Sequence, residues 1–279
     1  MKKRLYPDFL EKDRPVQPDE TIGSATLLEV QTAQGRVQGI VLSPNHREGE
    51  THPAVLMLHG FPGIASNQEL GQTLRKFGFV AIMPFAPGAW GSDGTYSFDG
   101  IVDAACEVAE YIHSTSFCGK YAIDPESIFL FGHSMGGFAA IHAVTKLPWK
   151  KAVVLAAPCD LDWYFQSGDL RFIDSLPEEG ARVLKTKENL RDNAVRIHRA
   201  YAFSAAYPAL EKKNLLLIEC SMDAEIPSEM LRPLKERILA HNSQCCRQSY
   251  VLLPTDHAFN DSKNRIAQVI ADFLIPLVE

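Results

Sequence analysis

The sequence lacks several features by which classes of protein are identified. Its 279 residues hold six cysteines with no Cys-x-x-Cys pair, so we expect reduced thiols and a cytoplasmic location rather than a disulfide framework. No apolar run approaches the roughly 20 residues that a membrane-spanning helix needs, so no membrane partner is expected. The net charge of −6 is mild and spread along the chain, which argues against a nucleic-acid partner.

Signatures of bound cofactors are also missing from the sequence. No group of His, Cys and Asp residues has the spacing of metal ligands, and no glycine pattern matches a phosphate-cradling or dinucleotide-binding loop. We therefore expect no metal and no other cofactor. Any chemistry has to come from the side chains of the chain itself.

The first residues begin like a secretory signal peptide but do not continue as one. Residues 1–4 are Met-Lys-Lys-Arg, yet proline and acidic residues follow where a signal peptide requires an apolar stretch. We interpret residues 1–20 as a polar extension lying over the surface. Residues 21–279 are expected to form a single domain, because no linker divides them. The composition leaves a homodimer open.

Strands and helices are predicted to alternate through most of the chain. The predicted strands are residues 27–32, 35–43, 54–58, 79–85, 127–131, 152–156, 215–219 and 249–253. The predicted helices lie near residues 66–77, 101–112, 137–147, 228–241 and 266–274. Ser66 and Glu69 form a capping box at the start of the first helix. Repeating βα units of this kind require an α/β fold, with a mostly parallel sheet and helices on both faces.

Residues 159–213 interrupt this alternation. The stretch is polar and charged but carries several aromatic residues, and we expect several short helices in it. Binding sites in open α/β sheets lie at the carboxyl ends of the strands, so an insertion after one such end should cover the site as a cap. We expect Trp163, Tyr164 and Phe165 of this cap, with Trp90 of a glycine-rich loop, to line a substrate pocket.

The segment Gly132-His133-Ser134-Met135-Gly136 places a serine at a sharp turn from a strand into a helix. The apolar residues 127–131 precede it, and the alanine-rich residues 137–147 follow it. Only glycine fits beside the serine at such a turn without a clash of its Cβ atom. The pattern predicts a nucleophile elbow with an exposed Ser134 hydroxyl. A simple helix N-cap is the alternative role for this serine.

A serine hydroxyl becomes a useful nucleophile when a histidine base, oriented by a carboxylate, lies beside it. His257 lies just past the predicted strand 249–253, and Asp223 lies just past the predicted strand 215–219. Both positions are at the carboxyl ends of late strands, where this type of site carries its acid and its base. We therefore predict a triad of Ser134, Asp223 and His257.

Other carboxylates compete with Asp223 for the role of the acid. Asp160 and Asp162 follow the preceding predicted strand and are alternatives, although we favour Asp223. Glu225 and Asp256 fit better as ordinary surface carboxylates.

A tetrahedral intermediate also needs two hydrogen-bond donors for its oxyanion. One is predicted to be the backbone N–H of Met135, immediately after the nucleophile. The second should come from the loop 59–63, where Phe61 is the candidate because Pro62 has no N–H.

These motifs together resemble the α/β-hydrolase superfamily, near its dienelactone-hydrolase, cinnamoyl-esterase and prolyl-oligopeptidase-like branch. The matching pieces are the loop 59–63, the loop 88–94, the dipeptide 124–125, the elbow 132–137, Asp223 and His257. The resemblance implies an α/β-hydrolase fold, with an eight-stranded, mostly parallel sheet and a helical cap insertion at about residues 159–213.

Departures from the patterns of this branch favour an esterase. Dienelactone hydrolases have a cysteine where this chain has Ser134, and the related peptidases usually have a tyrosine where it has Met135. We expect a serine hydrolase that cleaves small-molecule carboxylic esters through an acyl-enzyme, with small to medium, uncharged or aromatic groups. The same triad supports cleavage of amides, peptides or carbon–carbon bonds. A non-catalytic hydrolase-like binding protein is the alternative of a different class.

Overall fold

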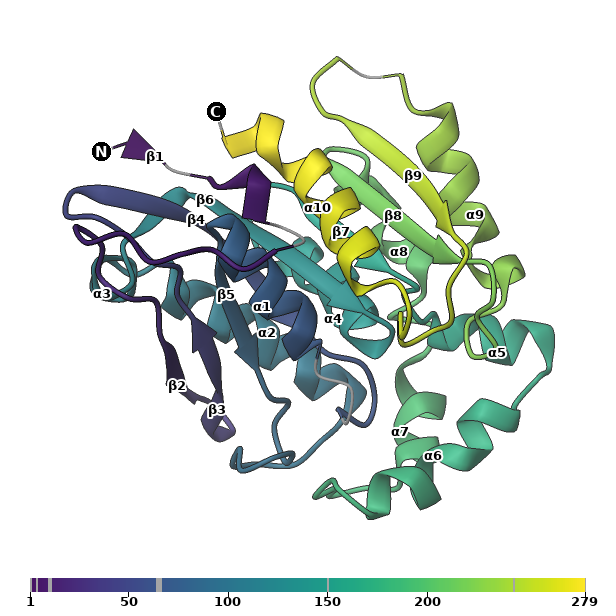
Figure 1. Ribbon diagram of the computed structural model, residues 1–279. Helices are drawn as coiled ribbons and strands as arrows, with labels where there is room; N and C mark the ends of the chain where they lie inside the picture. Colours follow the sequence, from purple (N-terminus) through teal and green to yellow (C-terminus); the bar gives the residue numbers. More distant parts are fainter. Residues whose placement is uncertain are drawn as a thin grey trace.

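The computed structural model describes residues 2–3, 5–9, 12–63, 67–149, 151–242 and 244–278. Its centre is a sheet in which the strands lie in the order β2-β3-β5-β4-β6-β7-β8-β9 (Figure 1). These strands are β2 (Ala25–Thr32), β3 (Gly35–Leu42), β4 (Glu50–Leu58), β5 (Val80–Pro84), β6 (Ile123–His133), β7 (Val153–Ala156), β8 (Leu215–Cys220) and β9 (Gln248–Leu253). A two-residue strand, β1 (Lys2–Lys3), pairs with the start of β4.

The sheet is mostly parallel. Strand β3 runs antiparallel to β2 and β5, and every neighbouring pair from β5 to β9 is parallel. Strands β5, β7 and β8 are buried along their whole length, because helices cover both faces of the sheet. The predicted α/β-hydrolase fold class, an eight-stranded mostly parallel sheet with helices on both faces, is confirmed.

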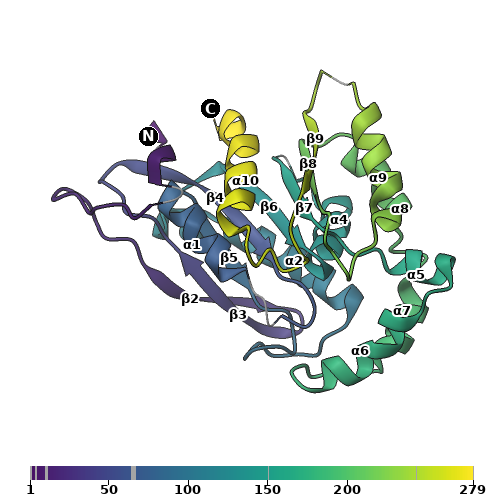
Figure 2. The same cartoon turned by 45° about the vertical axis from the view of Figure 1, so that its right-hand side comes forward.

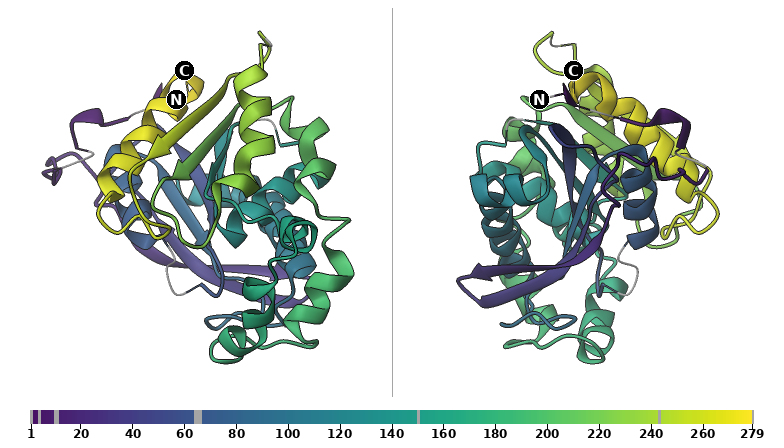
Figure 3. Two further views of the ribbon diagram at one scale, coloured as in Figure 1. Left: turned by 90° about the vertical axis from the view of Figure 1, so that its right-hand side faces the viewer. Right: turned by 60° about the vertical axis from the view of Figure 1, so that its left-hand side comes forward.

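Helices pack on the sheet in two layers. The helices α1 (Gln68–Phe77) and α10 (Lys263–Val278) contact each other on one face, while α2 (Phe98–Ile112), α4 (Met135–Lys146) and α8 (Phe203–Leu210) lie side by side on the other (Figure 3). The helix α9 (Ser228–Ala240) packs against β8 and β9, and α3 (Thr115–Lys120) packs against β6. Asn67 immediately precedes α1, whereas the predicted capping residue Ser66 lies outside the described residues.

Three short helices extend beyond the sheet at the carboxyl ends of its parallel strands (Figures 1 and 2). They are α5 (Leu161–Ser167), α6 (Arg171–Ala181) and α7 (Leu190–Ile197). We call them the cap helices. The next helix along the chain, α8, packs against α4 beside the sheet.

Backbone hydrogen bonds attach the cap helices to the loop that precedes α2. The Tyr96 N–H donates to Lys185 O at 2.7 Å, and the Lys185 N–H donates to Gly88 O at 2.8 Å. The fully buried Asn193 of α7 accepts from the Phe98 N–H at 2.8 Å. Loss of the hydrogen-bond partner of a buried amide lowers the stability of the fold. These bonds therefore hold the cap helices against the start of α2 and the loop before it.

The strongest steric restriction in the fold lies where α4 begins. A Cβ atom on Gly136 would lie 2.1 Å from Leu58 O and 2.6 Å from His59 O, both of which are backbone atoms at the end of β4. We expect Gly136→Ala to lower the free energy of unfolding by about 1–3 kcal/mol, because the backbone has to move to admit a methyl group. Urea denaturation followed by circular dichroism measures this loss.

A matched control is Gly119→Ala in α3. A Cβ atom at that position meets no atom within 4 Å. Alanine there should leave stability unchanged or raise it by up to about 1 kcal/mol, because alanine has the higher helix propensity. Equal denaturation midpoints for the two variants would contradict the close approach of β4 to α4.

Candidate active site

Ser134 lies at the turn between β6 and α4 with φ 55° and ψ −121°, a backbone conformation that costs a residue other than glycine about 1–3 kcal/mol. Hydrogen bonds around the turn offset this strain. The Ser134 N–H donates to Ala156 O at 3.0 Å, and the Ser134 carbonyl accepts from the N–H groups of Gly137, Phe138 and Cys159 at 2.9–3.1 Å. The sharp turn predicted at this serine is present, but Ser134 is only 9% exposed, so the predicted exposure of its hydroxyl is wrong.

The loop after β4 lies directly against the serine. A Cβ atom on Gly60 would lie 3.0 Å from Ser134 Cβ and 3.5 Å from Ser134 Oγ. Glycine at position 60 thus leaves space beside the Ser134 hydroxyl that a side chain would fill. The next residue along this loop is Phe61.

The two predicted oxyanion donors are Phe61, which follows Gly60, and Met135, which follows Ser134. Within the described part of the chain, neither backbone N–H has a hydrogen-bond partner. The Phe61 ring packs against Tyr96 and Phe98, with ring centroids 5.9 Å and 6.5 Å away, which holds the residue in place. Met135 is the first residue of α4, so its free N–H also lies at the positive end of the helix dipole.

His257 and Asp223 are in direct contact. The His257 Nδ1–H donates to Asp223 Oδ2 at 2.7 Å, and the Asp223 side chain is only 2% exposed. Asp223 Oδ1 accepts two backbone N–H groups, from Glu225 at 2.8 Å and from Ile226 at 2.9 Å. The loop after β8 therefore wraps around this carboxylate and fixes the oxygen that orients the imidazole ring.

The surroundings of His257 raise its pKa above the ordinary value. Burial alone lowers the pKa, but the hydrogen bond and the charge of Asp223, with the charges of Glu225 and Asp256, outweigh this effect. The imidazolium is thus stabilised in place, as a base that accepts a proton requires.

A second histidine connects His257 to the elbow. The His133 Nε2–H donates to His257 O at 2.9 Å, and the two rings lie 4.7 Å apart between centroids. Asn67 donates to His133 Nδ1 at 3.2 Å, which fixes the tautomer, and burial keeps the pKa of His133 well below its usual range. Ser134 directly follows His133 in the chain. The neutral ring of His133 therefore holds the loop of His257 beside Ser134.

The remaining ring nitrogen of His257 faces a carboxylate. His257 Nε2 lies 3.4 Å from Glu225 Oε2. No hydrogen bond joins the Ser134 hydroxyl to this ring among the residues that the structure describes. Catalytic hydrogen bonds are often completed only when substrate is bound. The structure therefore brings Asp223 and His257 together and places Ser134 next to the residue that holds His257.

The two alternative acids have other partners. Asp160 is the N-cap of α5, where it accepts from the Asp162 N–H at 3.1 Å, and it also accepts from the Phe203 N–H at 3.4 Å. Burial raises the pKa of Asp160 to about 6. Asp162 contacts His198 Nδ1 at 2.6 Å. Neither carboxylate is bonded to His257 in the described structure.

Sequence reasoning assigned four aromatic residues to the substrate pocket, and two of them have clear partners within the protein. Tyr164 is buried, and its hydroxyl donates to Glu225 O at 3.2 Å, so it supports the loop of the acid. Phe165 stacks on His198 of the cap, with 4.0 Å between ring centroids. Both side chains stabilise the cap and its junction with the loop after β8.

The other two aromatic residues lie closer to open space. Trp90 is 44% exposed, and its Nε1–H donates to Pro62 O at 3.4 Å, so its ring lies over the loop that carries Phe61. Trp163 is partly buried and packs edge-on against Tyr164 with 5.4 Å between ring centroids.

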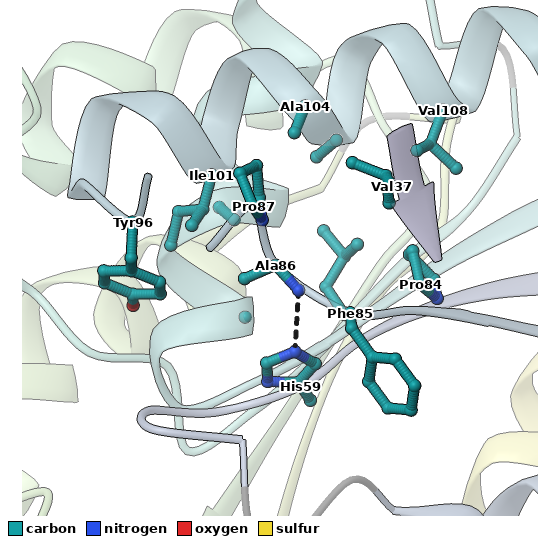
Figure 4. Close-up of a pocket in the computed structure, with 14 residues that line it drawn as sticks. Val37, His59, Pro84, Phe85, Ala86, Pro87, Tyr96, Ile101, Ala104 and Val108 are labelled. Atoms are coloured by element: carbon teal, nitrogen blue, oxygen red, sulfur yellow. Dashed lines mark hydrogen bonds between the residues drawn. The ribbon is translucent and has the colours of Figure 1, made fainter. Parts of the chain in front are cut away.

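An apolar pocket lies beside His59, the first residue of the loop 59–63 (Figure 4). It is lined by Val37, Leu58, His59, Pro84, Phe85, Ala86, Pro87, Tyr96, Ile101, Ala104, Ala105, Val108, Gly136 and Ala139. His59 accepts from the Ala86 N–H at 3.1 Å and donates through Nδ1 to Gly60 O at 2.8 Å, which fixes the loop at the mouth of the pocket. The pocket adjoins both the elbow and the oxyanion loop, and most of its lining is aliphatic.

Comparison with protein families identifies the fold independently. The model of the alpha/beta hydrolase family matches residues 55–269. The chain belongs to this family. The matched range includes Ser134, Asp223 and His257. Comparison with curated proteins finds none that matches the chain.

Solved structures share the fold at low sequence identity. DcsB, solved in complex with its substrate analogue, has a TM-score of 0.68 at 15% identity and covers 91% of this chain and 99% of its own. The Pyrococcus furiosus esterase Pf2001 has a TM-score of 0.62 at 15% identity, with coverage of 91% and 93%. The Pyrococcus horikoshii acylaminoacyl peptidase has a TM-score of 0.64 at 12% identity, with coverage of 91% and 41%. Across the described residues, no helix has both the length and the apolar character needed to cross a bilayer.

The Tyr164 hydroxyl should influence the acid–base pair through the Glu225 carbonyl that it holds. We expect Tyr164→Phe to loosen the loop around Asp223 and so to lower the pKa of His257. The sign follows because a weaker hydrogen bond to Asp223 stabilises the imidazolium less. Titration of the His257 ring by NMR measures the shift, and Asp223→Asn gives its upper limit.

Tyr121→Phe is the matched control for this variant. The Tyr121 hydroxyl is hydrogen-bonded to Thr26 Oγ1 at 3.1 Å, in contact with β2 rather than with the site. Its removal should leave the His257 titration unchanged. An unchanged titration in Tyr164→Phe as well would assign Tyr164 to cap packing alone.

Proposed function

We propose that this protein is a serine hydrolase that cleaves carboxylic esters of small molecules through an acyl-enzyme. The observation that carries the proposal is the 2.7 Å bond from His257 Nδ1 to Asp223 in the loop that His133 holds beside the strained elbow of Ser134. The backbone strain at Ser134 and the burial of the polar His257 side chain both lower the stability of the fold. A role in packing alone does not explain why the two features occur together.

Each residue has a defined role in this mechanism. His257 accepts the proton of the Ser134 hydroxyl through Nε2 as the oxygen attacks the ester carbonyl, and it then donates that proton to the leaving alcohol. Asp223 keeps Nδ1 protonated and stabilises the imidazolium. The N–H groups of Phe61 and Met135 stabilise the oxyanion. Water then attacks the acyl-enzyme with His257 again as base, which releases the acid and restores Ser134.

The apolar pocket beside the elbow supports the substrate class. Its aliphatic lining favours an uncharged acyl group of small to medium size, and Tyr96 and Trp90 add aromatic surface near the oxyanion loop. Cleavage of amides, peptides or carbon–carbon bonds uses the same groups, and a panel of acyl esters, aminoacyl amides and ring-cleavage substrates separates these activities.

Ser134→Ala and His257→Ala should each lower kcat on short p-nitrophenyl esters by a factor on the order of 10⁴–10⁶, because nucleophile and base act as a unit. A fluorophosphonate probe should label wild-type protein at Ser134 and leave Ser134→Ala unlabelled, as read by mass spectrometry. Turnover at the wild-type rate in either variant would refute the assignment. Failure of the folded wild-type protein to react with the probe would favour a non-catalytic binding protein.

The role of the acid is tested by one pair of isosteric changes. Asp223→Asn should lower kcat by a factor on the order of 10³–10⁴ with KM nearly unchanged, because the amide favours the wrong tautomer of His257. Asp160→Asn should leave kcat within a few-fold of wild type, because Asp160 caps α5. The reverse pattern would move the acid to the loop after β7.

A further inference from the structure

Glu225 has a fixed place beside the base. It follows Asp223 by two residues, and its Oε2 lies 3.4 Å from His257 Nε2. Its backbone is held on both sides, because the N–H donates to Asp223 Oδ1 at 2.8 Å and the carbonyl accepts from the Tyr164 hydroxyl at 3.2 Å. Its side chain is 64% exposed, so the carboxylate faces both the imidazole and solvent.

No lysine or arginine neutralises this carboxylate within the part of the chain that the structure describes. Lys263, the first residue of α10, is engaged elsewhere, since it donates to Ala258 O at 2.6 Å and lies 3.7 Å from Glu69. Asp256, the other acidic residue of this region, is bonded to Asn260. The one charged partner of Glu225 among the described residues is His257, and that ring is neutral in the state in which it acts as a base, so Glu225 then keeps its negative charge available to a ligand.

The chemistry of the proposed reaction determines which part of a substrate meets Glu225. His257 Nε2 donates its proton to the oxygen of the leaving alcohol, so that oxygen has to come within hydrogen-bond reach of Nε2. Glu225 Oε2 lies 3.4 Å from the same nitrogen, so it lies close to the first carbon atoms of the alcohol. In the proposed reaction the oxyanion lies at the N–H groups of Phe61 and Met135, and the acyl group is directed toward the apolar pocket that His59 and Gly136 help to line.

We propose that Glu225 selects esters whose leaving alcohol carries a positive charge, such as an ammonium group two carbons from the ester oxygen. This inference rests on the proposed ester hydrolase activity. It replaces the expectation that Glu225 is an ordinary surface carboxylate and that the alcohol is uncharged. The interaction is solvent-exposed, so the preference for a cationic over an isosteric neutral alcohol should be roughly two- to five-fold in kcat/KM.

The test compares choline butyrate with 3,3-dimethylbutyl butyrate, which have nearly the same shape and differ in charge. The ratio of their kcat/KM values is measured for wild type, Glu225→Gln and Glu225→Lys on the pH plateau of each protein. We expect the ratio to be highest in wild type, roughly two- to five-fold lower in Glu225→Gln, and lower still in Glu225→Lys. The intrinsic difference between the two leaving alcohols is the same in all three proteins, so the change in the ratio isolates the charge at position 225. The wild-type ratio should also fall toward that of Glu225→Gln as salt is added.

Glu229→Gln is the matched control, because Glu229 is an exposed carboxylate on α9 that pairs with Arg232. It should keep the wild-type ratio. The ratio cancels any effect of Glu225 on the basicity of His257, since both esters use the same base. A ratio that is the same in wild type and Glu225→Gln would overturn the role of Glu225 while leaving the esterase intact. Hydrolysis of neither ester by wild type, with Ser134 unreactive to the fluorophosphonate probe, would overturn both proposals.

Discussion

The close approach of two backbones at the start of α4 is the constraint on which the site depends. Gly136 lies against the last carbonyls of β4, and Gly60 lies against Ser134, so no side chain separates the elbow from the oxyanion loop. Phe61 follows Gly60 and Met135 follows Ser134, so this contact leaves both predicted oxyanion donors one residue away from it. It also accounts for the positive φ of Ser134, because the chain has to reverse direction within one residue to enter α4. The strain is tolerated because parallel strands on both sides fix where β6 ends.

Buried polar side chains hold the loops of the site by their backbone carbonyls. His133 binds the carbonyl of His257, Tyr164 binds that of Glu225, and His59 binds that of Gly60. A carbonyl is present at every residue, so this arrangement positions a loop without restricting the side chain that acts in it. Burial lowers the pKa of both His133 and His59, so that both rings are neutral. No positive charge on these rings then opposes the protonation of His257.

Local patterns predict the parts of the site that a short stretch of sequence determines. The flanking glycines and the preceding strand predict the tight turn at Ser134, and the places of Asp223 and His257 after late strands predict that these two residues meet, as they do in the structure. Asp160 follows a strand end equally well, and only the three-dimensional packing shows that it caps α5. Strand β6 starts at Ile123, four residues earlier than predicted. The polar residues 124–126 interrupt the apolar pattern, although Ile123 already pairs with β4. The supporting contacts of His133 and Tyr164 join segments more than 60 residues apart and leave no local signal.

One loop carries the two carboxylates that face the two nitrogens of the His257 ring. The segment after β8 supplies Asp223 to one nitrogen of His257 and Glu225 to the other, and the Asp223 carboxylate itself ties the two residues together through the Glu225 N–H. A shift of this loop would therefore change the basicity of His257 and the charge at the alcohol side together. The apolar pocket beside the elbow is built from different elements, including β5 and α2. If the protein acts as the proposed esterase, the acyl group meets this apolar surface and the leaving alcohol meets a carboxylate. The two surfaces come from different elements of the fold.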